Sequence, residues 1–517
     1  MELIFFPVIL FVMFYVCYQI MKSVLPGKNT RPETLAGDKL VHGRKIALNF
    51  LRPFVNSRKK EKGSRFLDEK KAKEVMKPSN KGLLLDGRHL RLTPQDSFTH
   101  CMVVAPNGAG KTTRYVIPNV LSVENCSMLI TDPSGEIFSQ TAGALESKGF
   151  DIKVIAPGDP HHSMCYNPLA NISSFNQILE ISKALVRSSL TGEIKPSEQF
   201  WYDGAADLIS VLIRCLGVSG RENLHLGNVV HLLQNFGGDG RGILDFIEKY
   251  ADEATMGQFT GLVTGNEKVL TSYVSTALNS LSQLNDPKLA ALMSTNEVEF
   301  SDLRKRKTAL FIIVPSQSLK HYRFFLNLLY TDFFGQMMET LPNHARKQGK
   351  KSLPVYCMMD EFGHMSLPDF AMTCTTIRKY EVSLSIILQN FTQLQTAYGH
   401  SEAQTIIDGG MQSKLFFPGL PPGTAKEVAE YLGEAIDHLV RWDGQYEERK
   451  SALLPHDRIR TLPDDNAIFI TGNKEPILLE TLPHFKSRTF VGPLKQKPSE
   501  SIQRRDLPKW SRMRVTE

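Results

Sequence analysis

The segment from Cys101 to Thr113 constrains the fold of this chain more than any other stretch. It begins with four apolar residues, Cys-Met-Val-Val, continues through a loop containing Gly108 and Gly110, and ends in Lys-Thr-Thr. A buried strand, a glycine-containing loop and the start of a helix form the layout of phosphate-binding loops. In such loops, backbone N–H groups and the positive end of the helix surround a phosphate. The segment therefore predicts a nucleotide site in an α/β fold.

This loop departs from the usual pattern at its first position, where Ala105 stands in place of glycine. A Cβ atom is tolerated there if φ is negative, so the chemistry of the loop is preserved. Lys111 would reach the β- and γ-phosphates of ATP, and the Thr112 hydroxyl would bind Mg²⁺. The residues expected to bind the nucleotide are Ala105, Pro106, Asn107, Gly108, Ala109, Gly110, Lys111, Thr112, Thr113 and Asp132. Asp132 is included because it follows the apolar run 127–131, and acidic residues after a strand lie on the ligand edge of such sheets.

A chance Gly-Lys-Thr turn is the competing interpretation, and a second motif decides against it. Residues 354–359 are apolar and are followed by Asp360 and Glu361. After a strand, such a pair is the expected companion of a phosphate-binding loop. Asp360 would hold Mg²⁺ through its water shell, and Glu361 would orient and polarise the attacking water. Alone, the acidic pair is equally typical of a solvated turn, but together with the loop it predicts a hydrolytic site.

Two further side chains are candidate catalytic residues. Gln389 ends the apolar run 382–388, where a polar side chain can contact the γ-phosphate or the attacking water. Arg378 precedes this run, and two interpretations of it stand. It either acts on the nucleotide of a neighbouring subunit in a ring, or caps its own helix.

Short apolar runs that alternate with helical patterns predict a parallel sheet covered by helices on both faces. Between about 171 and 300 the strand-like runs vanish and apolar residues follow helical spacing. We therefore expect one sheet domain in two parts, residues 81–170 and 301–490, with an all-α insertion at 171–300. The length of 517 residues agrees with more than one folded unit. Seven cysteines without a C-x-x-C pair argue against a disulfide framework.

The two ends of the chain have different compositions. Leu3 to Ile20 is almost wholly apolar, which predicts a single transmembrane anchor within residues 1–22. A cleaved signal peptide is the competing interpretation. Against it, Glu2 stands where a signal peptide has basic residues, and no cleavage site with small residues follows the apolar stretch. Lysine and arginine after the anchor place the bulk of the chain in the cytoplasm. Residues 23–80 are expected to be a basic linker, either solvated or against anionic lipid, with direct DNA contact as a less favoured third interpretation. Residues 491–517 are expected to be a basic mobile tail.

Taken in order, these motifs resemble the TraG/TraD-like coupling ATPases of type IV secretion and bacterial conjugation. The similarity runs from about Leu83 to Thr489. Its motifs are the loop 105–112 with Ile-Pro-Asn-Val-Leu at 117–121, Asp-Pro-Ser-Gly-Glu at 132–136, Tyr-Asn-Pro-Leu at 166–169, Phe-Trp at 200–201, Asp-Glu-Phe at 360–362, Arg-Lys-Tyr at 378–380, Ile-Leu-Gln-Asn at 387–390, Gln-Leu at 393–394, Tyr-Gly at 398–399, and Leu-Pro-Asp-Asp at 462–465.

This resemblance implies a RecA-like P-loop NTPase domain with an inserted all-α domain that receives substrate, and assembly as a homo-hexamer. It also implies attachment to the bacterial inner membrane and contact with type IV secretion channel components. Two features differ from the family pattern: one N-terminal membrane helix is expected instead of two, and Ser134 replaces a lysine.

The leading functional hypothesis is an inner-membrane ATPase that recruits a relaxase–DNA complex or an effector protein and energises its transfer. A ring interior lined with cations would grip single- or double-stranded DNA through its backbone, without sequence preference. The alternative is a nucleotide-binding receptor or scaffold without motor activity. A septal DNA translocase is a third hypothesis, but the several membrane helices and terminal winged helix typical of such motors are not seen.

Overall fold

The computed structural model describes residues 63–172, 174–188, 196–237, 240–264, 267–440, 446–496, 505–510 and 512–513. Contacts group the chain from Gly63 onward into one compact unit. The expected membrane anchor at 1–22 and most of the basic linker lie outside the described residues. Among the residues that are described, no helix is long and apolar enough to cross a membrane.

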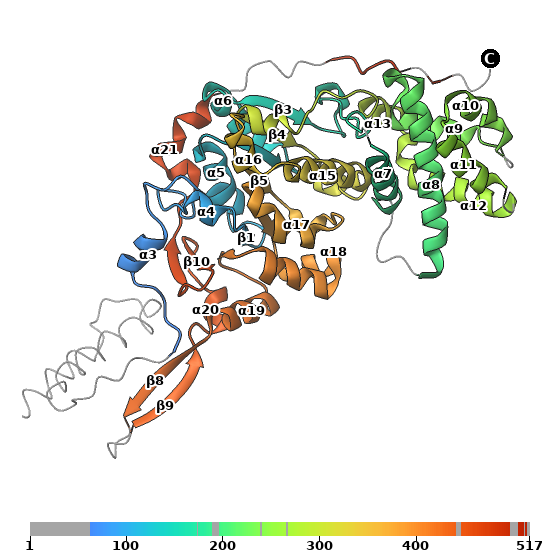
Figure 1. The fold of residues 1–517 in the computed structure, drawn as a ribbon. Helices are drawn as coiled ribbons and strands as arrows, with labels where there is room; N and C mark the ends of the chain where they lie inside the picture. The colour runs from blue at the N-terminus through green and yellow to red at the C-terminus, as the bar shows by residue number, and fades with distance from the viewer. Residues whose placement is uncertain are drawn as a thin grey trace, which may run out of the picture. The chain divides into compact units, whose positions relative to one another are not determined.

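A mostly parallel sheet forms the centre of the unit (Figure 1). In the described part of the chain it has nine strands, in the order β11-β10-β7-β1-β6-β5-β2-β4-β3. The strands from β7 to β3 in this order are parallel, whereas β10 is antiparallel to β7 and β11 is antiparallel to β10. Their bounds are β1 (Cys101–Val104), β2 (Ser127–Thr131), β3 (Asp151–Ile155), β4 (Thr308–Ile312), β5 (Val355–Met359), β6 (Val382–Leu388), β7 (Ser413–Phe416), β10 (Asn466–Thr471) and β11 (Ile477–Glu480).

The six strands from β7 to β4 in this order are buried on both faces, and alternate side chains enter two apolar clusters. In β1, Met102 and Val104 belong to one cluster, and Cys101 and Val103 belong to the other. The first cluster includes α15 (Arg323–Met338), α17 (Phe370–Thr376) and α18 (Phe391–Gln404). The second includes α5 (Ile117–Ser122) and α6 (Glu136–Ser147). Continuous apolar strands are typical of a parallel sheet covered in this way.

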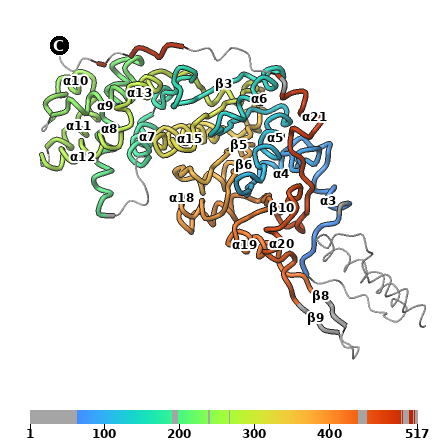
Figure 2. Tube along the Cα trace, turned by 180° about the vertical axis from the view of Figure 1, so that it is seen from behind, coloured from blue at the N-terminus to red at the C-terminus, as the bar shows by residue number. Residues whose placement is uncertain are grey.

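Between β3 and β4 the described residues form helices and no strand (Figure 2). The helices are α7 (Phe175–Ser188), α8 (Pro196–Ser219), α9 (Leu226–Gln234), α10 (Leu244–Tyr250), α11 (Glu253–Val263), α12 (Glu267–Ser280) and α13 (Pro287–Leu292). The apolar stripe of α8, including Leu208 and Leu212, is fully buried. We call residues 171–300 the helical segment below.

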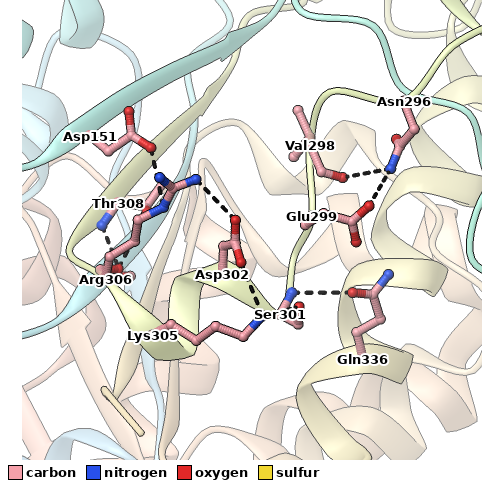
Figure 3. A network of polar contacts seen from close by, with 11 residues as sticks. Asp151, Asn296, Val298, Glu299, Ser301, Asp302, Lys305, Arg306, Thr308 and Gln336 are labelled. Carbon is pink, nitrogen blue, oxygen red and sulfur yellow. Dashed lines mark hydrogen bonds and ion pairs between the residues drawn. The ribbon is translucent and has the colours of Figure 1, made fainter. Parts of the chain in front are cut away.

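The chain returns from the helical segment to the sheet through a set of polar contacts (Figure 3). The backbone N–H of Ser301 donates to Gln336 Oε1 at 3.2 Å. Arg306 then pairs with Asp302 at 2.9 Å and with Asp151, at the start of β3, at 3.6 Å. These contacts hold the start of β4 beside β3, the strand after which the chain entered the helical segment.

The folded unit extends further toward both ends than the sequence analysis expected. Residues 63–80 were assigned to the linker, yet α3 (Glu69–Val75) forms there and Met76 is buried. Leu67 N donates to Pro476 O at 2.8 Å, which ties this part to the loop before β11. The expected tail at 491–517 includes the end of α21 (Arg488–Val491), and two of its described residues, Arg505 and Met513, are hydrogen-bonded to Glu297 and Asn228. Apart from the main sheet, β8 (Glu434–Val440) pairs antiparallel with β9 (Tyr446–Ala452).

Candidate nucleotide-binding site

The phosphate-binding loop begins where the hydrogen bonding of the sheet ends. Ala105 N donates to Leu388 O of β6 at 2.9 Å, so the Ala105 backbone continues the ladder. Gly108 and Gly110 then adopt left-handed φ values of 82° and 81°. A Cβ atom at Gly110 would lie 3.0 Å from Arg114 Nε. The loop therefore needs glycine at this position both for its backbone angle and for space.

Two buried polar residues fix the helix after the loop to neighbouring parts of the fold. It opens as a π-helical turn over Thr112–Val116 and continues as α5. Tyr115 Oη is 2.9 Å from Ser385 Oγ on β6. Asn119 accepts from Leu84 N at 2.7 Å and donates to Leu84 O at 2.8 Å and to Tyr115 O at 2.9 Å. These bonds fix the start of the helix, and with it Lys111 and Thr112.

Thr112 and Asp360 bring two oxygen ligands together. The Thr112 hydroxyl donates to Asp360 Oδ2 at 3.2 Å, and Asp360 is only 7% exposed. Burial raises the pKa of Asp360 to about 6, against the lowering effect of the Lys111 ammonium. Mg²⁺ in nucleotide sites takes one or two protein oxygens together with phosphate oxygens and water. A hydroxyl beside a carboxylate fits that ligand set.

Glu361 connects the loop to the other catalytic candidates. Its backbone is left-handed, with φ of 53°, and its carboxylate forms an ion pair with Lys111. Gln389 Nε2 donates to the other carboxylate oxygen at 2.9 Å. Strained backbone at a non-glycine residue costs free energy and is often found at functional sites. The structure thus brings Lys111, Thr112, Asp360, Glu361 and Gln389 into one connected group.

The order of the strands explains this meeting. β6 lies between β1 and β5, so Gln389 emerges between the phosphate-binding loop and the acidic pair. The carboxyl ends of parallel strands meet at one edge of a sheet, and ligands bind there in open α/β folds. All five side chains come from this edge.

Two residues that the sequence analysis did not select complete the group. Gln393 Oε1 accepts from Gln389 N at 2.8 Å, and its Nε2 is 3.4 Å from His364 Nε2. His364 Nε2 in turn lies 3.7 Å from Glu361 Oε2. Gly363 leaves the space for this arrangement, because a Cβ atom there would lie 2.4 Å from Gln393 Oε1. Gln393 belongs to the Gln-Leu motif at 393–394 that contributes to the family resemblance, whereas His364 is indicated only by its position three residues after Glu361.

Asp132 lies at the end of β2, and β6 and β5 separate this strand from β1 and its loop. The Asp132 carboxylate forms hydrogen bonds with residues of the turn and helix that follow β2. It accepts from Phe138 N at 2.7 Å, and the Ser134 hydroxyl donates to it at 3.4 Å. Burial raises the pKa of Asp132, partly offset by these hydrogen bonds. Ser134 also accepts from Glu136 N at 3.2 Å. Both residues stabilise the start of α6, and a contact between Asp132 and nucleotide stays a prediction.

Arg378 lies at the opposite edge of the sheet from the loop. It belongs to the 3-10 turn Ile377–Tyr380, which directly precedes β6, whereas the loop adjoins the far end of β6. Seven strand residues span about 20 Å. Arg378 is exposed, and it has no side-chain hydrogen bond or ion pair within the described part of the chain. It is therefore not a member of the group around its own loop.

A pocket of about 460 Å³ adjoins the loop on the side away from the acidic pair. Loop residues from Pro106 to Gly110 form one wall, and Arg460, Phe485 and Lys486 contribute to the others. Arg114 holds this side together, because it donates to Asp465 Oδ1 and to Thr481 O, both at 3.0 Å. The pocket offers room beside the loop for the remainder of a nucleotide.

The fold and the loop define a RecA-like α/β protein of the P-loop class. Residues 57–505 match the family described as type IV secretory system conjugative DNA transfer, and the chain belongs to this family. The membership predicted from the sequence motifs is confirmed.

Similar proteins carry related names. Protein VirD4 of Rhizobium radiobacter is 26% identical over 412 residues, which cover 76% of this chain and 58% of that protein. The type IV secretion system-coupling protein VirD4 of Bartonella henselae is 21% identical over 425 residues, covering 76% and 64%. The chain thus spans about three fifths of the length of these relatives.

Solved structures agree with the fold. Plasmid coupling protein TrwB in complex with ADP and Mg²⁺ aligns with a TM-score of 0.64 and 17% identity, covering 83% of this chain and 96% of that one. TrwB in complex with an ATP analogue aligns with a TM-score of 0.63 and 18% identity, covering 82% and 95%.

Proposed function

We propose that this chain is an ATP-hydrolysing coupling protein. It would use ATP and Mg²⁺ to drive a relaxase–DNA complex, or an effector protein, from the cytoplasm into a type IV secretion channel. One observation carries the proposal: Lys111, Asp360 and Glu361 come from distant parts of the chain and meet at one sheet edge. Family membership and the names of the VirD4 relatives support the transfer role.

Each side chain of the group has a distinct task in this proposal. Bound ATP with Mg²⁺ would supply the phosphoryl group and the metal charge that phosphoryl transfer requires. Thr112 and Asp360 hold the metal, and Lys111 leaves Glu361 to offset the charge of the phosphates. Glu361, then free of its ion pair, orients and polarises the attacking water, while Gln389 keeps the carboxylate in position.

Arg378 supports assembly as a ring. About 20 Å of strand separates it from its own loop, so its guanidinium cannot reach a nucleotide bound there. In a homo-hexamer, Arg378 of one subunit would stabilise the transition state in the next, as arginine fingers do. Cations lining such a ring would hold the DNA backbone without sequence preference. The anchor at residues 1–22 would attach the ring to the inner membrane.

The test is ATPase activity of the purified chain, with and without single-stranded DNA. We expect hydrolysis that DNA stimulates, and a loss of about 100-fold or more in kcat for Glu361→Gln with nucleotide binding retained. Glu124→Gln is the matched control and should behave as wild type, because Glu124 is exposed and lies just before β2, at the opposite edge of the sheet from the loop.

Two outcomes would overturn parts of this proposal. No hydrolysis under any condition would refute the motor and leave a nucleotide-binding receptor. Full substrate transfer by Glu361→Gln, with transfer lost when the helical segment is removed, would establish the receptor directly. Hydrolysis that ignores DNA would favour protein as the cargo.

A further inference from the structure

Residues 505–510 and 512–513, which we call the strap, run from the loop after β3 toward α8 and α9 (Figures 1 and 2). At its start, Arg505 pairs with both carboxylate oxygens of Glu297, at 2.6 and 2.7 Å. Both polar groups of the Arg505 backbone are paired with His161. The N–H donates to His161 O at 3.0 Å, and the carbonyl accepts from His161 Nδ1 at 2.9 Å. The start of the strap is therefore held through its main chain, as bound peptides are.

At the other end of the strap, both backbone groups of Met513 are paired with side chains of the helical segment. Met513 N donates to Asn228 Oδ1 at 3.1 Å, and Met513 O accepts from His231 Nε2 at 3.0 Å. Asn228 is fully buried, so its orientation is fixed by the fold. Its amide nitrogen donates to Asn223 O at 3.0 Å, which leaves its oxygen turned toward the strap.

Trp510 lies against His225 at the start of α9. The two ring centroids are 4.9 Å apart and the planes are inclined by 74°. His225 is 1% exposed, and its Nδ1 accepts from Asn228 N at 3.3 Å, so a neutral ring carries its proton on Nε2. Within the described part of the chain, Nε2 has no hydrogen-bond partner. An aromatic face is a weak partner for such an N–H group, and the Trp510 indole is the ring beside it.

The glycine next to His225 makes room for the indole. A Cβ atom at Gly227 would lie 2.9 Å from the nearest Trp510 ring carbon. We call His225, Gly227, Asn228 and His231 the His225 surface. This surface has two features. Polar side chains on it pair with the backbone of the strap, and the space beside Gly227 holds one aromatic ring. In peptide-binding sites, main-chain hydrogen bonds supply affinity and side-chain slots supply specificity.

We propose that the His225 surface is a binding site for a tryptophan-bearing peptide, which Trp510 and Met513 occupy in the free chain and from which a segment of a cargo protein displaces them. The identity of the displacing partner as cargo rests on the proposed function, whereas the peptide site does not. The partner chemistry follows from the strap itself: a cation, a tryptophan five residues later, and an apolar residue three beyond that.

Because the occupant is tethered, a free peptide must compete with it. A tether of a few residues gives an effective concentration of about 1 mM. For a peptide with a dissociation constant of about 100 µM, this competition weakens the apparent affinity about tenfold. Vacating the surface should therefore expose a binding activity that the wild-type chain largely hides.

The experiment uses the full chain without nucleotide and a fluorescent peptide with the sequence of residues 505–513. We expect Trp510→Ala to bind the peptide about ten times more tightly than wild type. Adding Gly227→Ala should abolish this binding. Adding Gly217→Ala should not, because a Cβ atom at Gly217 of α8 meets nothing within 4 Å. A small carrier protein ending in the same nine residues should bind the Trp510→Ala chain as well as the peptide does.

Several results would overturn the proposal. These are no peptide binding to Trp510→Ala at millimolar concentration while its circular dichroism matches wild type, equal loss of binding with Gly217→Ala and Gly227→Ala, or failure of the carrier to bind. A peptide with alanine in place of tryptophan should not bind, and equal binding would count against the aromatic slot. ATPase activity, measured separately, decides the proposed function independently of these outcomes.

Discussion

Replacing Asn119 with alanine should destabilise the protein by releasing Leu84 from the helix that follows the phosphate-binding loop. The Asn119 side chain is fully buried and pairs with both the N–H and the C=O of Leu84. Leu84 is itself fully buried, so water does not replace the lost partners. An unsatisfied buried polar group costs about 1–3 kcal/mol, and two such groups give a loss of about 2–6 kcal/mol in the free energy of unfolding.

Equilibrium urea unfolding followed by circular dichroism measures this loss as a shift of the unfolding midpoint, with the slope of the free energy against urea concentration unchanged. Asn80→Ala is the matched control. Asn80 also donates to a backbone carbonyl, that of Arg91 at 2.9 Å, but it is only partly buried, and we expect a loss below about 1 kcal/mol. A loss below 1 kcal/mol for Asn119→Ala, or equal losses for both variants, would refute the reasoning.

Four further predictions concern the site. Burial raises the pKa of Asp360 from its ordinary 3.8 to about 6, so the folded state holds this proton more tightly than the unfolded state. The stability that this carboxyl contributes is therefore greatest below pH 4 and lost as pH rises from about 4 to 6. Asp360→Asn should remove that part of the pH dependence in thermal unfolding, and an unchanged profile would contradict it. Mg²⁺-dependent nucleotide binding by wild type should weaken below about pH 6, as calorimetry would show, because the metal needs the ionised carboxylate. Gly363→Ala should displace Gln393 and lower kcat about 10- to 100-fold with nucleotide binding retained; wild-type kcat would rule out a positioning role for Gln393. Gly110→Ala should weaken ATP binding at least tenfold in a filter or fluorescence assay, since its φ of 81° disfavours a side chain, whereas Gly217→Ala should not.

Local patterns predicted the parts of the fold that depend on local chemistry. The runs 127–131 and 382–388 are strands with the same bounds, because a short apolar run between turn residues is itself the signal of a buried strand. Lys111, Asp360 and Glu361 were found for the same reason, since each stands at a fixed place after such a run.

What the sequence could not indicate depends on pairing between distant segments. Nothing in an apolar run states which strand will lie beside it, so the position of β6 between β1 and β5 appears only in the structure. The left-handed backbone of Glu361 and its ion pair with Lys111 follow from that order. Arg505, Trp510 and Met513 were expected to lie in a mobile tail because the contacts that hold them, one ion pair, one ring and main-chain hydrogen bonds, leave no periodic pattern in the sequence.

The helical segment leaves the sheet after β3 and returns at β4, and these two strands are the outermost pair on their side of the sheet. Four strands stand between β3 and β1, the strand that carries the phosphate-binding loop. An insertion with both ends at this margin can be lengthened, shortened or exchanged without moving any strand that bears a member of the catalytic group. The architecture therefore allows the helical segment to change in evolution while the group around Lys111 and Glu361 keeps its geometry.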